Sequence, residues 1–158
     1  MNIYVASSWR NPFQPSVVQR LRADGHGVYD FRNPPERAGF SWSEIDPNWK
    51  SWTPEQWKAA LQHPAAQAGY QSDMLGLVGC DCCVLVLPCG RSAHLELGYA
   101  AGARKLTAVY VPPDAEGQEP ELMVKMCDAI LTHPEELSSW CRRNSLGLEN
   151  QANYFPKA

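Results

Sequence analysis

The feature that most constrains the fold is a regular alternation of short apolar segments with helix-forming segments. DCCVLVL, at residues 81–87, is a nearly continuous apolar run of the kind found in strands buried on both faces of a parallel sheet. Shorter apolar runs that also read as strands occur at residues 2–6, 28–31, 106–111 and 128–131. The helix-forming segments between and after them are residues 15–24, 53–61, 65–79, 92–104 and 134–143.

Strands that alternate with helices predict an α/β fold. We expect a three-layer sandwich of the flavodoxin or Rossmann type, whose mainly parallel five-stranded sheet has the strand order 2-1-3-4-5. The 158 residues fit one domain, 1–158, with a real core. Within it, residues 32–53 form a long Trp-rich insertion with no expected regular structure, and such loops often act as lids.

Composition excludes several classes of protein. The net charge is −3, so no basic field would recruit nucleic acid. The chain has no apolar run of about 18 residues, so no membrane span is expected. Its start lacks a signal-peptide core, so a cytoplasmic location is expected.

The six cysteines do not suggest a metal site. Adjacent Cys82 and Cys83 should point to opposite faces of one strand, and no second pair lies at zinc-ligand spacing. We interpret the cysteines as small buried hydrophobes, except Cys89, which follows the strand.

In the expected strand order a ligand binds where the loops after the first and third strands meet. These loops are SSWRN and PCGRS, and each contains an arginine, Arg10 or Arg91, suited to an anion such as phosphate. Alternatively, both arginines are simply solvated. Aromatic side chains of the insertion could stack on a planar ring or form a separate hydrophobic cluster. The candidate substrate-binding residues are Ser7, Ser8, Trp9, Arg10, Phe40, Trp42, Gly90, Arg91 and Ser92.

Two carboxylates are candidates for chemistry. Glu96 lies in or just past the first turn of the helix after the third strand, where the helix N-terminus should lower its pKa and leave an ionised nucleophile. Asp73, on the preceding helix, could reach the strand ends. The alternative for both is a surface carboxylate on a helix. A nucleophile–base pair of Cys89 and His94 is a weaker candidate, because no third residue completes a triad.

Three segments resemble the nucleoside 2-deoxyribosyltransferase superfamily: IYVASSWRN, SDMLGLVGCDCCVLVLP and AHLELGYAAGARKLTAVYV, which together cover about a third of the chain. The resemblance implies that Glu96 attacks the anomeric carbon, that Tyr4 orients Glu96, and that Asp73 assists departure of the base. It also implies a homodimer or larger homo-oligomer and no cofactor or metal.

The sequence departs from the transferases of that family in the loop PCGRSAH, which has no acidic residue. A loop with Arg91 and Ser92 is more similar to the nucleotide hydrolases of the superfamily, which hold a 5′-phosphate with a serine-containing loop. We therefore expect an enzyme that hydrolyses the N-glycosidic bond of a small-molecule nucleotide or deoxynucleotide. The alternatives are a 2-deoxyribosyltransferase proper, a glycohydrolase of NAD-like dinucleotides, and a nucleotide-sensing module without chemistry.

Overall fold

A computed structural model describes residues 1–35, 38–115 and 119–154 of the chain. Within these residues, five parallel strands form one sheet in the order β2-β1-β3-β4-β5, which confirms the predicted order. The strands are β1 (Asn2–Ala6), β2 (Gly27–Asp30), β3 (Cys82–Val86), β4 (Leu106–Tyr110) and β5 (Ala129–Leu131).

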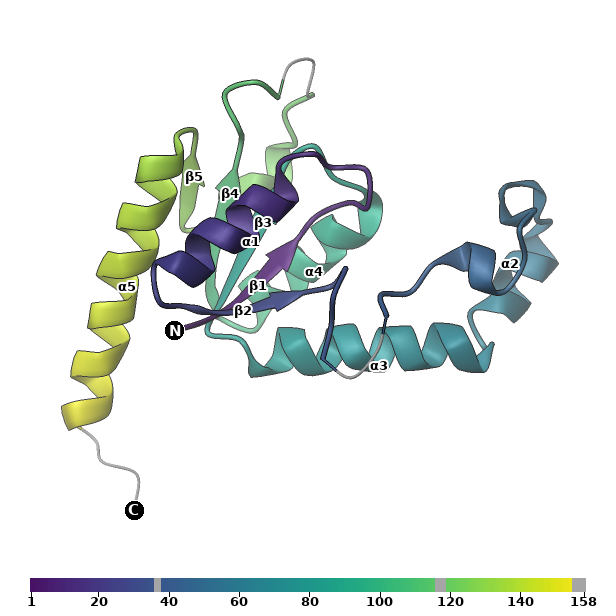
Figure 1. The fold of residues 1–158 in the computed structure, drawn as a ribbon, viewed down its shortest axis with the longest axis horizontal. Coiled ribbons are helices and arrows are strands. Elements are labelled where there is room, and N and C mark those ends of the chain that lie inside the picture. Colours follow the sequence, from purple (N-terminus) through teal and green to yellow (C-terminus); the bar gives the residue numbers. More distant parts are fainter. Residues whose placement is uncertain (36–37, 116–118, 155–158) are drawn as a thin grey trace.

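Helices cover both faces of the sheet, as expected for a three-layer sandwich (Figure 1). The helices are α1 (Gln14–Ala23), α2 (Pro54–Ala60), α3 (Pro64–Gly79), α4 (Arg91–Gly102) and α5 (Pro134–Tyr154). The last helix is longer than the predicted 134–143, because the polar sequence after residue 143 continues the helix. Thr53 and Gln56 form the capping box that the sequence predicted at the start of α2.

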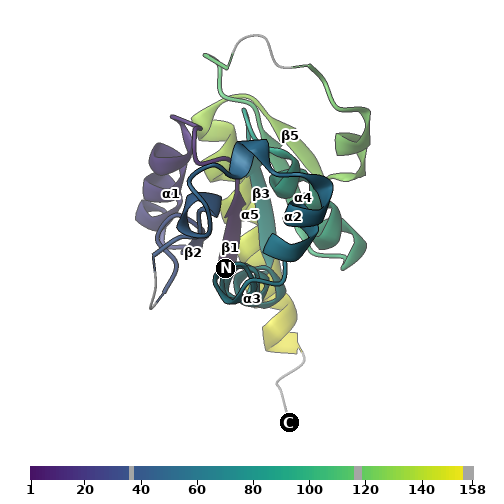
Figure 2. The ribbon, with the colours of Figure 1, turned by 90° about the vertical axis from the view of Figure 1, so that its right-hand side faces the viewer.

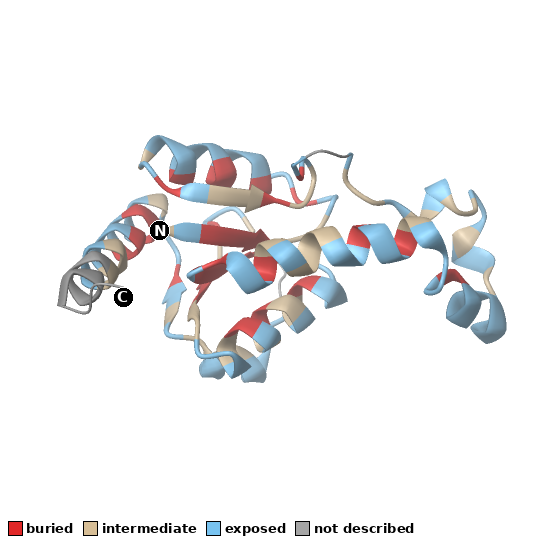
Figure 3. Ribbon diagram, turned by 90° about the horizontal axis from the view of Figure 1, so that it is seen from below, coloured by how far each residue is buried: buried red, intermediate tan, exposed pale blue. Residues whose placement is uncertain are grey.

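Alternating strand residues divide the core into two layers. Side chains such as Ile3, Val5 and Cys82 pack with α1 and α5, whereas Tyr4, Cys83 and Leu85 pack with α3 and α4. The prediction that Cys82 and Cys83 face opposite ways is therefore confirmed. All five residues of β3 are buried, and buried positions concentrate between the helix layers (Figure 3).

All six cysteines are free thiols. Four of them are buried, as the sequence interpretation required: Cys80, Cys82, Cys83 and Cys141. Cys89 is partly exposed in the loop after β3, as expected. Cys127 is also partly exposed, so the expectation that it is buried is wrong. None of the described helices is long and apolar enough to span a membrane.

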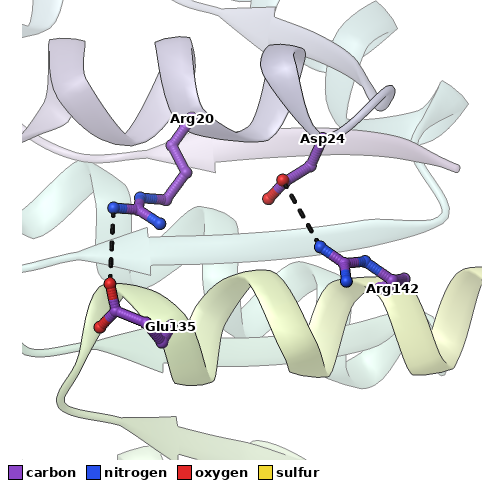
Figure 4. A network of polar contacts seen from close by, with 4 residues as sticks. All are labelled: Arg20, Asp24, Glu135 and Arg142. Carbon is purple, nitrogen blue, oxygen red and sulfur yellow. Dashed lines mark ion pairs between the residues drawn. The ribbon is translucent and has the colours of Figure 1, made fainter.

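α5 lies beside α1, and two ion pairs join the helices at their surface (Figure 4). Arg20 Nη2 lies 3.7 Å from Glu135 Oε1, and Arg142 Nη2 lies 3.8 Å from Asp24 Oδ1. Such exposed pairs each contribute about 0–1 kcal/mol. Buried Leu137, Trp140 and Cys141, which pack against the sheet, therefore hold α5 in place more than the ion pairs do.

The Trp-rich insertion forms two short 3-10 turns, η1 (Trp42–Glu44) and η2 (Trp49–Ser51). With α2 it lies beyond the N-terminal end of α3, away from the sheet (Figures 1 and 2). The arrowheads of β1 and β2 point toward this side of the molecule (Figure 1). The insertion is thus on the side of the carboxyl ends of these strands, where a lid would have to be. Residues 36 and 37 of the insertion lie outside the described ranges.

Candidate active site

The loops after β1 and β3 meet, as the strand order predicted. Asn11 is buried, and its Nδ2 donates to the carbonyl oxygens of Val86 and Pro88, each at 2.9 Å. The Ser7 hydroxyl also donates to Val86 O, at 2.8 Å. Asn11 Oδ1 accepts from the amides of Phe13 and Gln14, which connects the same side chain to the start of α1. These bonds give the two loops one defined relative position.

Asn11 was not among the sequence candidates, although it is in the SSWRN loop. A polar residue after a strand indicates a ligand or a loop contact equally well, and only the partners across the sheet distinguish the two. Ser7, a predicted binding residue, uses its hydroxyl in the same loop contact. Ser8 contributes its carbonyl oxygen, which accepts from Arg32 Nη2 at 2.6 Å, and its hydroxyl, which accepts from the Arg10 amide.

Tyr4 is a fully buried residue of β1 on the face covered by α3 and α4. The register of β1 with β2 pairs it with Tyr29, and the two rings stack with centroids 5.1 Å apart and planes 10° from parallel. Burial, together with the charges of Glu96 and Asp73, raises the pKa of the Tyr4 hydroxyl far above its ordinary value. Tyr4 is therefore a protonated phenol and can act only as a hydrogen-bond donor toward a nearby carboxylate.

Asp73 lies on α3 and is partly buried, so it is not the solvated helix residue that was the alternative. Its Oδ1 accepts a 2.9 Å hydrogen bond from the Tyr29 hydroxyl. The same hydroxyl lies 3.0 Å from Ser72 Oγ. The carboxylate thus points toward β2 and β1 and faces the core, as a residue of the site must.

Glu96 is the sixth residue of α4, and its pKa is raised to about 7. Burial of the carboxyl is the main cause and the charge of Asp73 the second, while hydrogen bonding from Tyr4 lowers the pKa in part. The expected lowering by the helix N-terminus is therefore wrong. Glu96 lies more than one turn from that terminus, where the dipole is weak, and desolvation and a like charge outweigh it.

Tyr4, Asp73 and Glu96 lie close together, because the charges of both carboxyls raise the pKa of Tyr4 and the charge of Asp73 raises the pKa of Glu96. Among the described residues the buried Tyr4 hydroxyl has no hydrogen-bond partner, although it lies near enough to Glu96 to favour the ionised carboxylate. Because ionised Asp73 disfavours a second negative charge beside it, Glu96 is present in both its protonated and its ionised form near neutral pH. The site therefore places an exchangeable proton on Glu96 next to a second carboxyl, that of Asp73.

Cys89 and His94 are also brought together, with Sγ 3.5 Å from Nδ1. Burial and the charges of Glu96 and Glu121 raise the pKa of the Cys89 thiol to about 12. At neutral pH this thiol is protonated and is a poor nucleophile. The structure therefore does not favour the cysteine mechanism.

The candidate phosphate-binding residues lie at the ends of the two loops. Arg10 is exposed, Gly90 caps the start of α4, and exposed Arg91 and Ser92 are the first two residues of that helix. Arg91 also lines a groove of about 480 Å³ between α4 and η3 (Leu122–Met126). Convergence of Arg10 and Arg91 on one ligand stays a prediction.

The aromatic candidates form two groups. Trp9, which is half exposed, packs edge-on against Phe31 and under the Arg32 guanidinium. Phe40 packs edge-on against Trp42, which in turn packs against Trp52. A Cβ at Gly69 of α3 would lie 2.8 Å from Phe40 Cβ, so the second group sits directly on α3, one turn before Asp73. Contact of either group with a substrate stays a prediction.

Among the residues that the structure describes, no three His, Cys, Asp or Glu side chains gather in a way that could hold a metal ion. The site residues themselves include no histidine or thiolate. The chemistry that this arrangement can perform by its own side chains is that of a carboxylate pair with a phenol donor.

No protein-family model and no curated protein matches this sequence. Solved structures do match its fold. A 2-deoxyribosyltransferase from the psychrotolerant bacterium Bacillus psychrosaccharolyticus has a TM-score of 0.56 at 19% identity, over 87% of this chain and 90% of that chain. A conserved protein from Enterococcus faecalis V583 has a TM-score of 0.60 at 12% identity, over 91% and 98% of the chains.

A CMP N-glycosidase from Clostridium botulinum, BcmB, is also similar, with a TM-score of 0.49 at 11% identity over 90% and 99% of the chains. The likeness to the Bacillus enzyme shows that this chain has the fold of a 2-deoxyribosyltransferase, which is the fold that the sequence resemblance implied.

Proposed function

We propose that this protein is an enzyme that cleaves the N-glycosidic bond of a nucleotide or deoxynucleotide, with Glu96 as nucleophile and Asp73 as the acid. The observation that carries the proposal is the closeness of two partly buried carboxyls, Glu96 and Asp73, to Tyr4, with the pKa of Glu96 raised to about 7. A solvated pair of helix carboxylates would not interact in this way. The likeness to a 2-deoxyribosyltransferase supports the same class of bond.

The roles follow from the chemistry of the bond. Departure of the base leaves an oxocarbenium-like sugar, which an anion beneath the anomeric carbon stabilises and then traps as an ester. The base leaves more readily when an acid donates a proton to it. Passage of the Glu96 proton to Asp73 would supply both functions, and the Tyr4 hydroxyl favours the ionised form of Glu96 that results. These groups make a cofactor unnecessary for the proposed reaction.

The substrate is proposed to carry a phosphate, held by Arg10, Arg91 and Ser92 at the two loops. Exposed arginines at loop ends and a helix start suit a dianion. Phe40 and Trp42 of the insertion, residues 32–53, are proposed to cover the base, because Phe40 packs on α3 at Gly69, one turn before Asp73, and Trp42 packs against Phe40. Since the loop before Glu96 has no acidic residue, hydrolysis is favoured over transfer to a second base.

Transfer is the second candidate, because a solved structure with this fold is a 2-deoxyribosyltransferase. The two candidates differ only in what captures the sugar ester: water in the hydrolase, and a second base in the transferase. Closure of the insertion over the site would exclude water and favour transfer.

The experiment is a chromatographic screen. Purified protein is incubated with each common nucleoside and 5′-nucleotide, ribo and deoxy, and with NAD, in the presence and absence of an acceptor base. Free base without an acceptor is the expected result, and it should vanish in Glu96→Ala, which keeps the fold and nucleotide binding. A new nucleoside formed only with an acceptor identifies the transferase, and nicotinamide release identifies a dinucleotide substrate. Nucleotide binding without any product would refute an enzymatic function in favour of a sensing module.

We also propose that the protein is a homo-oligomer. The groove between α4 and η3 is lined by exposed apolar side chains, Leu95, Met123 and Met126 among them. Contiguous exposed apolar surface of this kind is unusual on a monomer and marks an interface. A second copy of this chain is the proposed occupant.

A further inference from the structure

Tyr29 of β2 connects the two side chains that act on Glu96. Its ring stacks on Tyr4, 5.1 Å away, because the β1–β2 register places the two residues side by side. Its hydroxyl donates to Asp73 Oδ1 at 2.9 Å. The single side chain of Tyr29 therefore contacts the phenol that favours ionised Glu96 and the carboxylate that disfavours it.

The fold makes room for this ring at one position of α3. Residue 76, one turn after Asp73, is a glycine, and a Cβ there would lie 2.5 Å from Tyr29 Cδ2 and 2.6 Å from Cγ. Any side chain at this position would move the ring. Gly76 thus allows α3 to approach β2 closely enough for the hydroxyl of Tyr29 to reach Asp73.

We infer that Tyr29 is a positioning residue for the proposed cleavage, one that fixes the Tyr4 ring by stacking and the Asp73 carboxyl by a hydrogen bond. This inference rests on the proposed function. Tyr29 acts on the reaction through Asp73 and Tyr4 and is not itself required to touch the substrate.

The position of the Asp73 carboxyl matters because, in the proposed reaction, it gives a proton to the leaving base and later takes one from water. The C1′–N bond breaks and its electron pair leaves with the base, while a Glu96 oxygen forms the C1′–O bond. The base nitrogen takes the proton of Asp73. In the second step water attacks C1′, its proton passes to Asp73, and Glu96 leaves as a carboxylate. The hydrogen bond from Tyr29 to Oδ1 holds the Asp73 carboxyl in one orientation during both proton transfers.

The variant Tyr29→Phe separates the two contacts, because it keeps the ring and removes only the hydroxyl. Tyr70→Phe is the matched control, since it removes a hydroxyl from a tyrosine of α3 that is 67% exposed. The first readout is the titration of Glu96, followed by ¹³C NMR of glutamate-labelled protein and assigned by loss of the signal in Glu96→Gln. It requires no substrate.

A donated hydrogen bond stabilises an ionised carboxylate, so its loss should move the shared proton from Glu96 toward Asp73. We expect the Glu96 midpoint to fall by at least about half a pH unit in Tyr29→Phe, and to stay at the wild-type value in Tyr70→Phe. An unchanged midpoint in Tyr29→Phe would overturn the inference whatever the kinetics show.

The second readout compares 2′-deoxyguanosine 5′-monophosphate with its 7-methyl derivative, whose cationic base leaves without a proton. Tyr29→Phe leaves Asp73 more often protonated but no longer held in position, so it should lower kcat by about tenfold or more on the first nucleotide and by less than about threefold on the second, with KM little changed. Equal losses on both would show a merely structural role and overturn the inference. If the wild type releases base from no nucleotide at all, the proposed function fails, and the titration alone decides whether Tyr29 positions Asp73.

Discussion

At the scale of the residue, the main result is that burial decides the electrostatics of Glu96. A carboxyl near a helix N-terminus should have a lowered pKa, yet desolvation and Asp73 raise it to about 7. Ionised Glu96 is therefore destabilising in the folded protein. Such a cost is common where a site is arranged for chemistry and not for stability.

The sign of the effect on stability follows from the pKa values. The folded protein holds the Glu96 proton up to about pH 7, whereas the unfolded chain loses it near the ordinary value of 4.5. The free energy of unfolding should therefore fall as the pH rises from 4.5 to 7. Glu96→Gln removes this cost and should stabilise the protein by about 2 kcal/mol at pH 8, with little change at pH 4.

Urea unfolding of Glu96→Gln and of the wild type, each at pH 4 and pH 8, measures this difference in the free energy of unfolding. Glu136→Gln is the control with the opposite sign, because backbone hydrogen bonds from Thr132 and His133 lower the pKa of exposed Glu136. Glu136→Gln should therefore lower the free energy of unfolding at pH 8. An equally stable Glu96→Gln at pH 8 would contradict the raised pKa.

At the scale of the element, α3 is positioned by its glycines. Gly69 accommodates Phe40 of the insertion and Gly76 accommodates the Tyr29 ring, so both contacts of the helix near Asp73 depend on missing side chains. Gly79, at the end of the same helix, has no atom within 4 Å of its Cβ position. In sequence the three glycines look alike.

Gly76→Ala should therefore destabilise the protein by about 1–3 kcal/mol and lower turnover, because the Tyr29 ring must move away from α3 and its bond to Asp73 is lost. Gly79→Ala should be neutral or stabilising by up to about 1 kcal/mol, since alanine favours the helix and meets no neighbour. Denaturant unfolding and base release measure both. Similar effects of the two substitutions would argue against a close contact at residue 76.

At the scale of the whole molecule, the apolar groove beside α4 is the surface through which we propose that two copies of the chain associate. Leu95 is 76% exposed at its edge. Leu95→Asp should convert a dimer or larger assembly into monomers, because a desolvated carboxylate in an apolar interface is costly. Leu146→Asp is the control, as Leu146 is 56% exposed on α5, outside the groove.

Light scattering after size exclusion measures the mass of each variant. Retention of the wild-type mass by Leu95→Asp, or a monomeric wild type, would refute the proposed interface.

The sequence by itself determined the class of fold, the strand order and nearly every element, because apolar periodicity and helix caps are local signals. It indicated Glu96 and Asp73 as candidates from their positions, and the resemblance to a family added Tyr4 and the roles of all three. It did not indicate Tyr29, Asn11 or Gly76, nor the direction of the Glu96 pKa shift. Those depend on strand register and on the distance between α3 and the sheet, which bring together residues far apart in the chain. Burial and pairwise contact are properties of the packed molecule, and only the tertiary structure decided them.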